Sequence, residues 1–192
     1  MSLTVAEAIA TRRATRQYSD QEVTNEVLDR VVAQALEAPT AFNAQRADLV
    51  VVRDQEVKDA LFEASGQAQL RDAPVVFVAV ARTDVPTDLK DILGDERGEW
   101  VENFFAGLDA AKLRESAIKD ATLVAGFLLL AAQGEGLATS PTTGWDEELV
   151  LKAVGLPGGE RHAVALVVAA GYPGEHPSHP GREANRRVND RY

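Results

Sequence analysis

The chain has 192 residues, enough for a sizeable core, and we expect residues 1–192 to form a single domain. Its 20 basic and 30 acidic residues give a net charge of −10, and no basic run with interleaved aromatic residues appears, so a nucleic-acid partner is not expected. The absence of cysteine excludes disulfides, thiolate metal sites and cysteine nucleophiles.

Two helices are predicted in the N-terminal part of the chain. Thr4 and Glu7 have the spacing of a capping box, and the helix behind them should end near Arg12. The second helix should begin at a Thr24 cap and stop before Pro39, because proline disfavours helical geometry in the residue ahead of it. No signal-type apolar region precedes them, so we expect a cytoplasmic protein with no membrane partner.

Apolar runs predict three clear strands, at residues 48–53, 75–81 and 163–170. The second run is apolar throughout, which indicates burial on both faces. The segment GLATSPTTGWD (136–146) predicts a further short strand that runs into a loop. Helices should follow Asp54 and Asp146, because aspartate is a favoured N-cap.

The most apolar stretch, residues 109–137, predicts a central helix. From Ala121 to Ala132 the only polar residue is Thr122, so this half should be buried all round. It is too short to cross a bilayer, and we expect it both in the core and in a subunit interface. The preceding residues 84–105 lack periodicity and predict an excursion with a short helix, anchored by Trp100, Phe104 and Phe105. Together these segments predict an α+β sandwich of helices on a small sheet.

Standard catalytic signatures are absent from the sequence. His162 lies beside a strand, and His176 and His179 lie in a proline-rich tail, where a plain loop is favoured over a metal pair. No metal is therefore expected. If the chain is an enzyme, a cofactor should carry its reaction.

Arginines gather at both ends of the chain: Arg12, Arg13 and Arg16, then Arg186 and Arg187. They could close on one phosphate, because the guanidinium fork suits a dianion, although solvated surface arginines would give the same pattern. The loops between them supply donors and acceptors suited to a heterocycle with amide-like edges, from Thr40, Asn43, Gln69, Thr142, Thr143 and Gly144.

In sequence order these pieces resemble the nitroreductase-like FMN-dependent oxidoreductases. The matching segments cover nearly the whole chain: RRATRQY (12–18), APTAFNAQ (38–45), Gln69 with DAPVVFVAVA, the apolar central helix, SPTTGWD (140–146), the VGLP and VALVVAAGYP runs, and NRRV. The resemblance implies a three-layer α+β sandwich with a small mixed sheet. It also implies an intertwined homodimer, in which the tail of residues 175–192 packs on the partner subunit.

The resemblance also implies roles for the arginines. Arg12 and Arg13 would grip the FMN phosphate or ribityl region, and Arg186 or Arg187 would complete the phosphate site. Arg16 would reach toward the N1 and O2 edge of the isoalloxazine, where a cation stabilises the reduced flavin.

The other site residues follow from the same resemblance. Gln69 would hydrogen-bond the flavin pyrimidine. One loop would line the flavin from the partner subunit, with Thr40, Ala41 and Asn43. A second loop would place backbone groups near N5, with Thr142, Thr143 and Gly144. The residues nearest the chemistry would be Arg16, Thr143 and Gly144.

The implied activity is a ping-pong hydride transfer from NADH or NADPH, through FMN, to nitroaromatics, quinones or related electron-poor acceptors. Two alternatives stay open: another flavin reaction such as reductive dehalogenation, and a flavin-binding or structural dimer without this activity. Two positions depart from the family pattern. Ala14 stands where serine is frequent, and Arg46 and Ala47 stand where Pro-Trp is frequent.

Overall fold

The computed structural model describes residues 3–159, 161–183 and 186–189. Its four strands form one sheet in the order β1-β2-β4-β3, and their bounds are β1 (Ala47–Val52), β2 (Val75–Arg82), β3 (Ala138–Thr142) and β4 (His162–Gly171). The strand positions confirm the sequence prediction to within a few residues. All three ladders are antiparallel, whereas a mixed sheet was expected. Among the described residues the parallel pairing is confined to an isolated bridge between Ala14 and Thr139.

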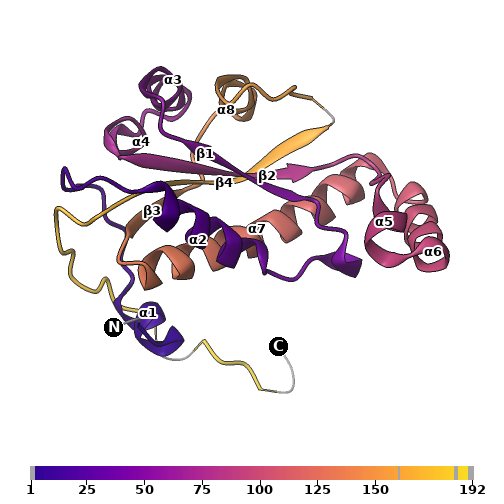
Figure 1. Cartoon of the computed structure of the whole chain (residues 1–192), viewed down its shortest axis with the longest axis horizontal. Helices are drawn as coiled ribbons and strands as arrows, with labels where there is room; N and C mark the ends of the chain where they lie inside the picture. The colour runs from indigo at the N-terminus through magenta and orange to yellow at the C-terminus, as the bar shows by residue number, and fades with distance from the viewer. Residues whose placement is uncertain (1–2, 160, 184–185, 190–192) are drawn as a thin grey trace.

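Helices cover both faces of this sheet and make the three layers that were predicted (Figure 1). One face carries α2 (Asn25–Leu36) and α7 (Ala110–Gly134). The opposite face carries α3 (Gln55–Ser65), α4 (Ala68–Asp72) and α8 (Glu147–Ala153). Helix α1 (Val5–Thr11) contacts α7, and a 3₁₀ turn, η1 (Ala41–Asn43), lies in the predicted loop.

Side-chain caps fix where several helices begin. The Thr4 and Glu7 side chains form a complete capping box at α1. Asp54, Asp109 and Asp146 each accept a hydrogen bond from a backbone N–H in the first turn of α3, α7 and α8. These carboxylates satisfy donors that have no partner inside a helix, which is why their positions could be predicted.

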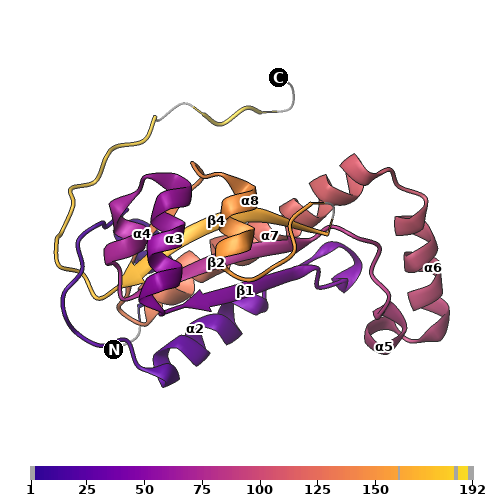
Figure 2. The ribbon, with the colours of Figure 1, turned by 90° about the horizontal axis from the view of Figure 1, so that it is seen from above.

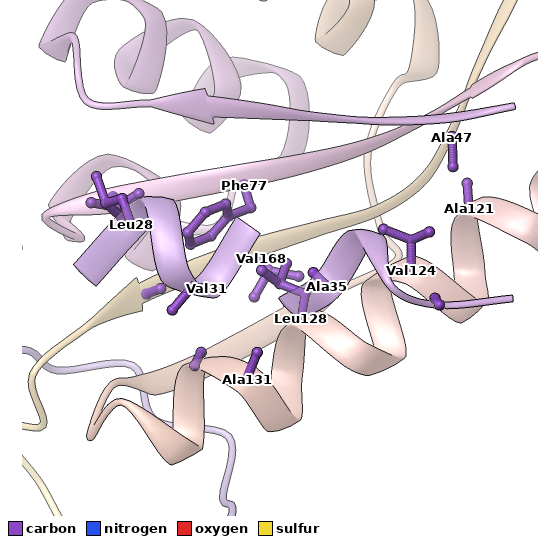
Figure 3. Packing of buried hydrophobic residues seen from close by; sticks show 14 of the residues in the cluster. Leu28, Val31, Ala35, Ala47, Phe77, Ala121, Val124, Leu128, Ala131 and Val168 are labelled. Carbon is purple, nitrogen blue, oxygen red and sulfur yellow. The ribbon is translucent and has the colours of Figure 1, made fainter. Parts of the chain in front are cut away.

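The larger core lies between the sheet and the helices α2 and α7 (Figure 3). Phe77 of β2 and Leu128 of α7 are fully buried there, together with Val31 of α2. Strand β2 is buried along seven of its eight residues because it lies inside the sheet and both its faces are covered by helices. The prediction of burial on both faces is confirmed.

Helix α7 has an uncovered side in the single chain. Leu123 and Phe127 are 47% and 42% exposed, so the prediction of all-round burial is wrong for one copy. The sheet and α2 cover one side of the helix and α1 contacts another part of it, but no described element buries Leu123 or Phe127. By length and composition α7 could also cross a membrane, but its Leu128 side is packed on the sheet.

The excursion between β2 and α7 forms two helices, α5 (Leu89–Leu93) and α6 (Asp95–Ala106), beyond one end of the sheet (Figure 2). Phe105 is fully buried, but Trp100 and Phe104 are 59% and 44% exposed. Of the three predicted aromatic anchors, Phe105 is therefore the one that anchors α6 in the core. The rings of all three contact Phe42 of the η1 turn edge-on.

The burial of α7 gives a direct test of the core. Leu128→Ala should lower the free energy of unfolding by about 2–5 kcal/mol, because it removes fully buried apolar volume and leaves a cavity. Urea denaturation measures the loss. The control is Leu149→Ala on α8, where the side chain is 46% exposed and the loss should be within about 1 kcal/mol. Equal losses for the two variants would contradict the core described above.

Candidate functional site

The first part of the candidate site is the segment that follows α1. The backbone of Ala14 bridges Thr139 of β3, and the Thr15 N–H donates to the Thr139 carbonyl at 3.0 Å. The Tyr18 hydroxyl donates to the Thr15 carbonyl at 2.8 Å. Burial raises the pKa of the Tyr18 phenol, so it stays neutral and keeps donating. The arginines of this segment are thus carried on a backbone that is hydrogen-bonded to β3.

Arg12 has the features of an anion-binding residue. Its Nη1 is buried and has no hydrogen-bond partner among the residues that the structure describes. Burial, with the nearby charges of Arg182 and Arg13, lowers the pKa of the Arg12 guanidinium. Positive charges that converge around an unpaired donor are costly unless an anion neutralises them. The arrangement therefore fits the phosphate group that the sequence predicts here.

The neighbouring arginines are placed differently. Arg13 Nη1 donates to the carbonyls of Ala10 and Arg12, both at 2.8 Å. Arg16 is exposed, and its backbone N–H donates to the Glu175 carboxylate at 2.6 Å. Glu175 thus links the start of the C-terminal tail to residues 12–16, which we call the arginine segment.

Arg182 is the tail arginine that lies near Arg12, and sequence reasoning did not assign it to the site. Arg186 pairs with Glu183 at 3.1 Å, and Arg187 donates to Asn189 at 2.9 Å. Both are exposed, so their predicted contacts to the phosphate stay predictions. The signal for Arg182 was its place in the same basic tail, but nothing local distinguished it from its neighbours.

The second part of the site is the turn after β3. The Gln67 side-chain amide donates to the Thr142 hydroxyl and, at 2.9 Å, to the Gly144 carbonyl. Gln69 donates in turn to Gln67 Oε1 at 2.9 Å. The structure therefore links Gln69 to Thr142 through Gln67, a residue that the sequence did not single out. Thr143 is exposed beside them.

Gly144 of this turn is not a crowded position. A Cβ on Gly144 would meet Gln67 Nε2 at 3.7 Å, which is an ordinary contact. Thr139 and Thr142 lie three residues apart on β3, about 10 Å at the usual rise per residue. The arginine segment and this polar turn thus follow one strand, an arrangement that suits an elongated ligand with an anionic end.

The third part, Thr40, Ala41 and Asn43, lies elsewhere. The Ala41 N–H donates to Asp120 of α7 at 2.9 Å, and Thr40 and Asn43 line a cavity of about 650 Å³. The arginine segment meets α7 near its other end, where Gln133 donates to Thr11 at 3.3 Å. Asp120 and Gln133 are about 20 Å apart along the helix axis. One chain does not bring the two groups of predicted residues together.

No group of three or more potential metal ligands occurs in the described part of the chain. The donors at the candidate site are guanidinium, amide, hydroxyl and backbone groups. Such donors suit a phosphate and a heterocycle.

Comparisons with known proteins agree with this geometry. The model of the nitroreductase family matches residues 9–172. An NADH dehydrogenase of Thermus thermophilus is 35% identical over 180 residues, covering 88% of this chain and 87% of the relative. An NAD(P)H-dependent FMN reductase of Bacillus subtilis is 28% identical over 138 residues, covering 71% of this chain and 53% of the relative.

The fold agrees as well. A structure from Exiguobacterium sibiricum, solved in complex with FMN, superposes with a TM-score of 0.88 at 20% identity, over 96% of this chain and 95% of that one. The family model covers most of the chain, and the Thermus thermophilus relative covers nearly as much. The resemblance seen in the sequence is confirmed: the chain belongs to the nitroreductase family.

Proposed function

We propose that the chain is an FMN-dependent NAD(P)H oxidoreductase, with residues 1–192 acting as one FMN-binding domain of a homodimer. The observation that carries the proposal is the buried, unpaired Nη1 of Arg12 beside Arg13 and Arg182. The names of the relatives, an NADH dehydrogenase and an FMN reductase, support the same cofactor and cosubstrate. A cytoplasmic location stays a prediction from the sequence.

The residues of the arginine segment and of the β3 turn would hold the cofactor. Arg12, Arg13 and Arg182 would bind the phosphate, and Gln69 with the Thr142 turn would hydrogen-bond the ring system. When bound, FMN would supply the redox chemistry, passing two electrons from NADH or NADPH to a nitroaromatic, a quinone or a related acceptor. We propose ping-pong order, in which the nicotinamide leaves before the acceptor binds.

The protein's own contribution would be electrostatic. No general base is required, because the chain needs only to hold charges and hydrogen-bond donors where negative charge develops. The Arg16 side chain is exposed on the arginine segment, so its guanidinium would be free to approach the ring. Backbone groups of Thr143 and Gly144 would orient the ring near N5.

The homodimer would supply what one chain lacks. The uncovered side of α7 presents Leu123 and Phe127, and Val5 and Ile9 of α1 are 70% and 60% exposed. Leu3, Val5 and Phe127 also line a hollow of about 360 Å³ between α1 and α7. A contiguous apolar surface of this kind is typical of an interface. After β4 the chain bonds to residues 16 and 17 through Glu175, and its remaining described residues continue as an extended trace without helix or strand (Figures 1 and 2). Such a tail is suited to the predicted packing on a partner.

The central test is cofactor binding with turnover. The purified protein should bind FMN and oxidise NADH or NADPH steadily with menadione or nitrobenzene as acceptor. Arg12→Gln should weaken FMN affinity about tenfold or more, because it removes a charged donor to the phosphate. Titration of flavin fluorescence measures the affinity.

The control for this titration is Arg53→Gln, which removes an exposed arginine bonded to Asn25 and outside the proposed cofactor site, and which should change affinity less. A wild-type protein that binds no FMN would contradict the proposed function. Bound FMN without NAD(P)H oxidation would favour the flavin-binding alternative.

Arg16→Ala should lower the two-electron reduction potential of the bound flavin by up to about 20 mV, because an exposed charge contributes at most about 1 kcal/mol. Arg16→Lys keeps the charge and should keep the potential closer to that of the wild type. Spectroelectrochemical titration compares the three proteins. An unchanged potential in Arg16→Ala would remove the role assigned to this side chain.

Phe127→Glu should dissociate the homodimer, because it places a charge in the apolar surface of α7 and leaves the Leu128 side of the helix intact. Light scattering coupled to size-exclusion chromatography measures the mass. Leu149→Glu, a matched change of an exposed leucine on α8, should remain dimeric. A monomeric wild type, or a Phe127→Glu variant that stays dimeric, would contradict the proposed interface.

A further inference from the structure

A buried arginine follows the loop that carries Thr40 and Asn43. Arg46 is 1% exposed, and its guanidinium carbon lies 4.3 Å from the centre of the Phe105 ring of α6. Its Nη2 donates to Ser116 Oγ at 2.8 Å, and its Nη1 donates to the Leu113 carbonyl at 3.4 Å, both on α7. The side chain therefore joins the start of β1 to α6 and α7.

Asp120 of α7 is the buried anion beside this cation. It is 4% exposed, and its Oδ2 lies 3.9 Å from Arg46 Nη2. Its Oδ1 accepts the Ala41 N–H of the loop at 2.9 Å. Burial raises the pKa of Asp120, while the Ala41 N–H and the Arg46 charge act in the opposite direction. Each charge is tolerated in the interior because the other is present.

The loop held by this pair has an unusual backbone. Phe42, Asn43 and Gln45 have φ angles of 57°, 58° and 49°, in the left-handed region that non-glycine residues rarely adopt. Such conformations persist only where surrounding contacts hold them. Within the loop, the Gln45 N–H donates to Thr40 Oγ1 at 3.0 Å. The hydrogen bond from Ala41 to Asp120 ties the same turn to α7.

The pair is also incompletely satisfied. Neither Arg46 Nε nor Asp120 Oδ2 has a hydrogen-bond partner among the residues described by the structure. A buried polar network in this condition contributes little to stability compared with an apolar core. The pair is therefore better explained by a role other than stability, and the Ala41 contact points to the shape of the loop.

We propose that Arg46 and Asp120 form a positioning pair that holds the left-handed loop of residues 40–45 in the shape that presents Thr40 and Asn43 to the cofactor. The effect on the cofactor rests on the proposed function, whereas the effect on the loop does not. Arg46 stands where the family often has Pro-Trp.

The loop is tested first without cofactor. In Asp120→Ala and in Asp120→Asn, amide hydrogen exchange of residues 38–47 should speed up, most in Asp120→Ala, because the side-chain amide oxygen introduced by Asp120→Asn can still accept the Ala41 N–H. The control is Lys58→Met. It removes another buried cation that donates to a backbone carbonyl, that of Ala73 at 2.8 Å on the opposite face of the sheet. Exchange of residues 38–47 that matches the wild type in both Asp120 variants would overturn the proposal.

The cofactor is tested next. Asp120→Ala should weaken FMN affinity about tenfold. Asp120→Asn should recover part of this loss, and Lys58→Met should keep wild-type affinity at a lowered melting temperature. Asn43→Ala should weaken binding in the wild type and add little in the Asp120→Ala background, because the loop is already displaced there.

Full additivity of Asn43→Ala with Asp120→Ala would overturn the claim that the pair acts through the loop. If Asp120→Ala does not fold, Asp120→Asn and Arg46→Lys carry the same measurements. A wild type that binds no FMN, together with faster loop exchange in the variants, would reject the proposed function and leave the support of the loop standing.

Discussion

Helix α7 has more apolar surface than one chain can cover, and the arrangement of the molecule follows from that constraint. Leu128 and its neighbours pack on the sheet, whereas Leu123 and Phe127 remain exposed. The two groups of predicted cofactor residues meet α7 at points about 20 Å apart along its axis. We propose that a second copy of the chain covers the exposed side of α7 and also supplies the loop of residues 40–45 to the arginine segment.

Much of the fold could be predicted because its signals are local. Asp54 and Asp146 cap helices through bonds to backbone groups three residues away, and the run at residues 75–81 is apolar because both its faces are covered. The all-round burial of α7 could not be judged in the same way. Apolar residues at Leu123 and Phe127 look alike in sequence whether the sheet or a partner is to cover them.

The sequence singled out candidate site residues that lie in short contiguous motifs. It did not single out residues that reach the site only because the fold brings distant parts of the chain together. Gln67 bonds to the turn of Thr142 across 75 positions of sequence, and no local pattern marks it. Arg182 resembles the other tail arginines until its proximity to Arg12 is known. Arg46 is an arginine buried under an aromatic ring, which is rare enough that sequence alone predicts the opposite.

The central claim is that each cofactor site is shared between two chains. The measurement that tests it most directly is complementation between two variants that each fail to bind FMN tightly. One chain would carry Arg12→Glu, and the other would carry both Thr40→Ala and Asn43→Ala. Neither homodimer should bind FMN tightly. A mixture refolded together should regain wild-type affinity in part of its sites, because each mixed dimer has one site in which Arg12 of one chain and the loop of the other chain are both unchanged. Mixed dimers that form, as shown by differently tagged chains, and yet bind FMN no better than either parent would contradict the account.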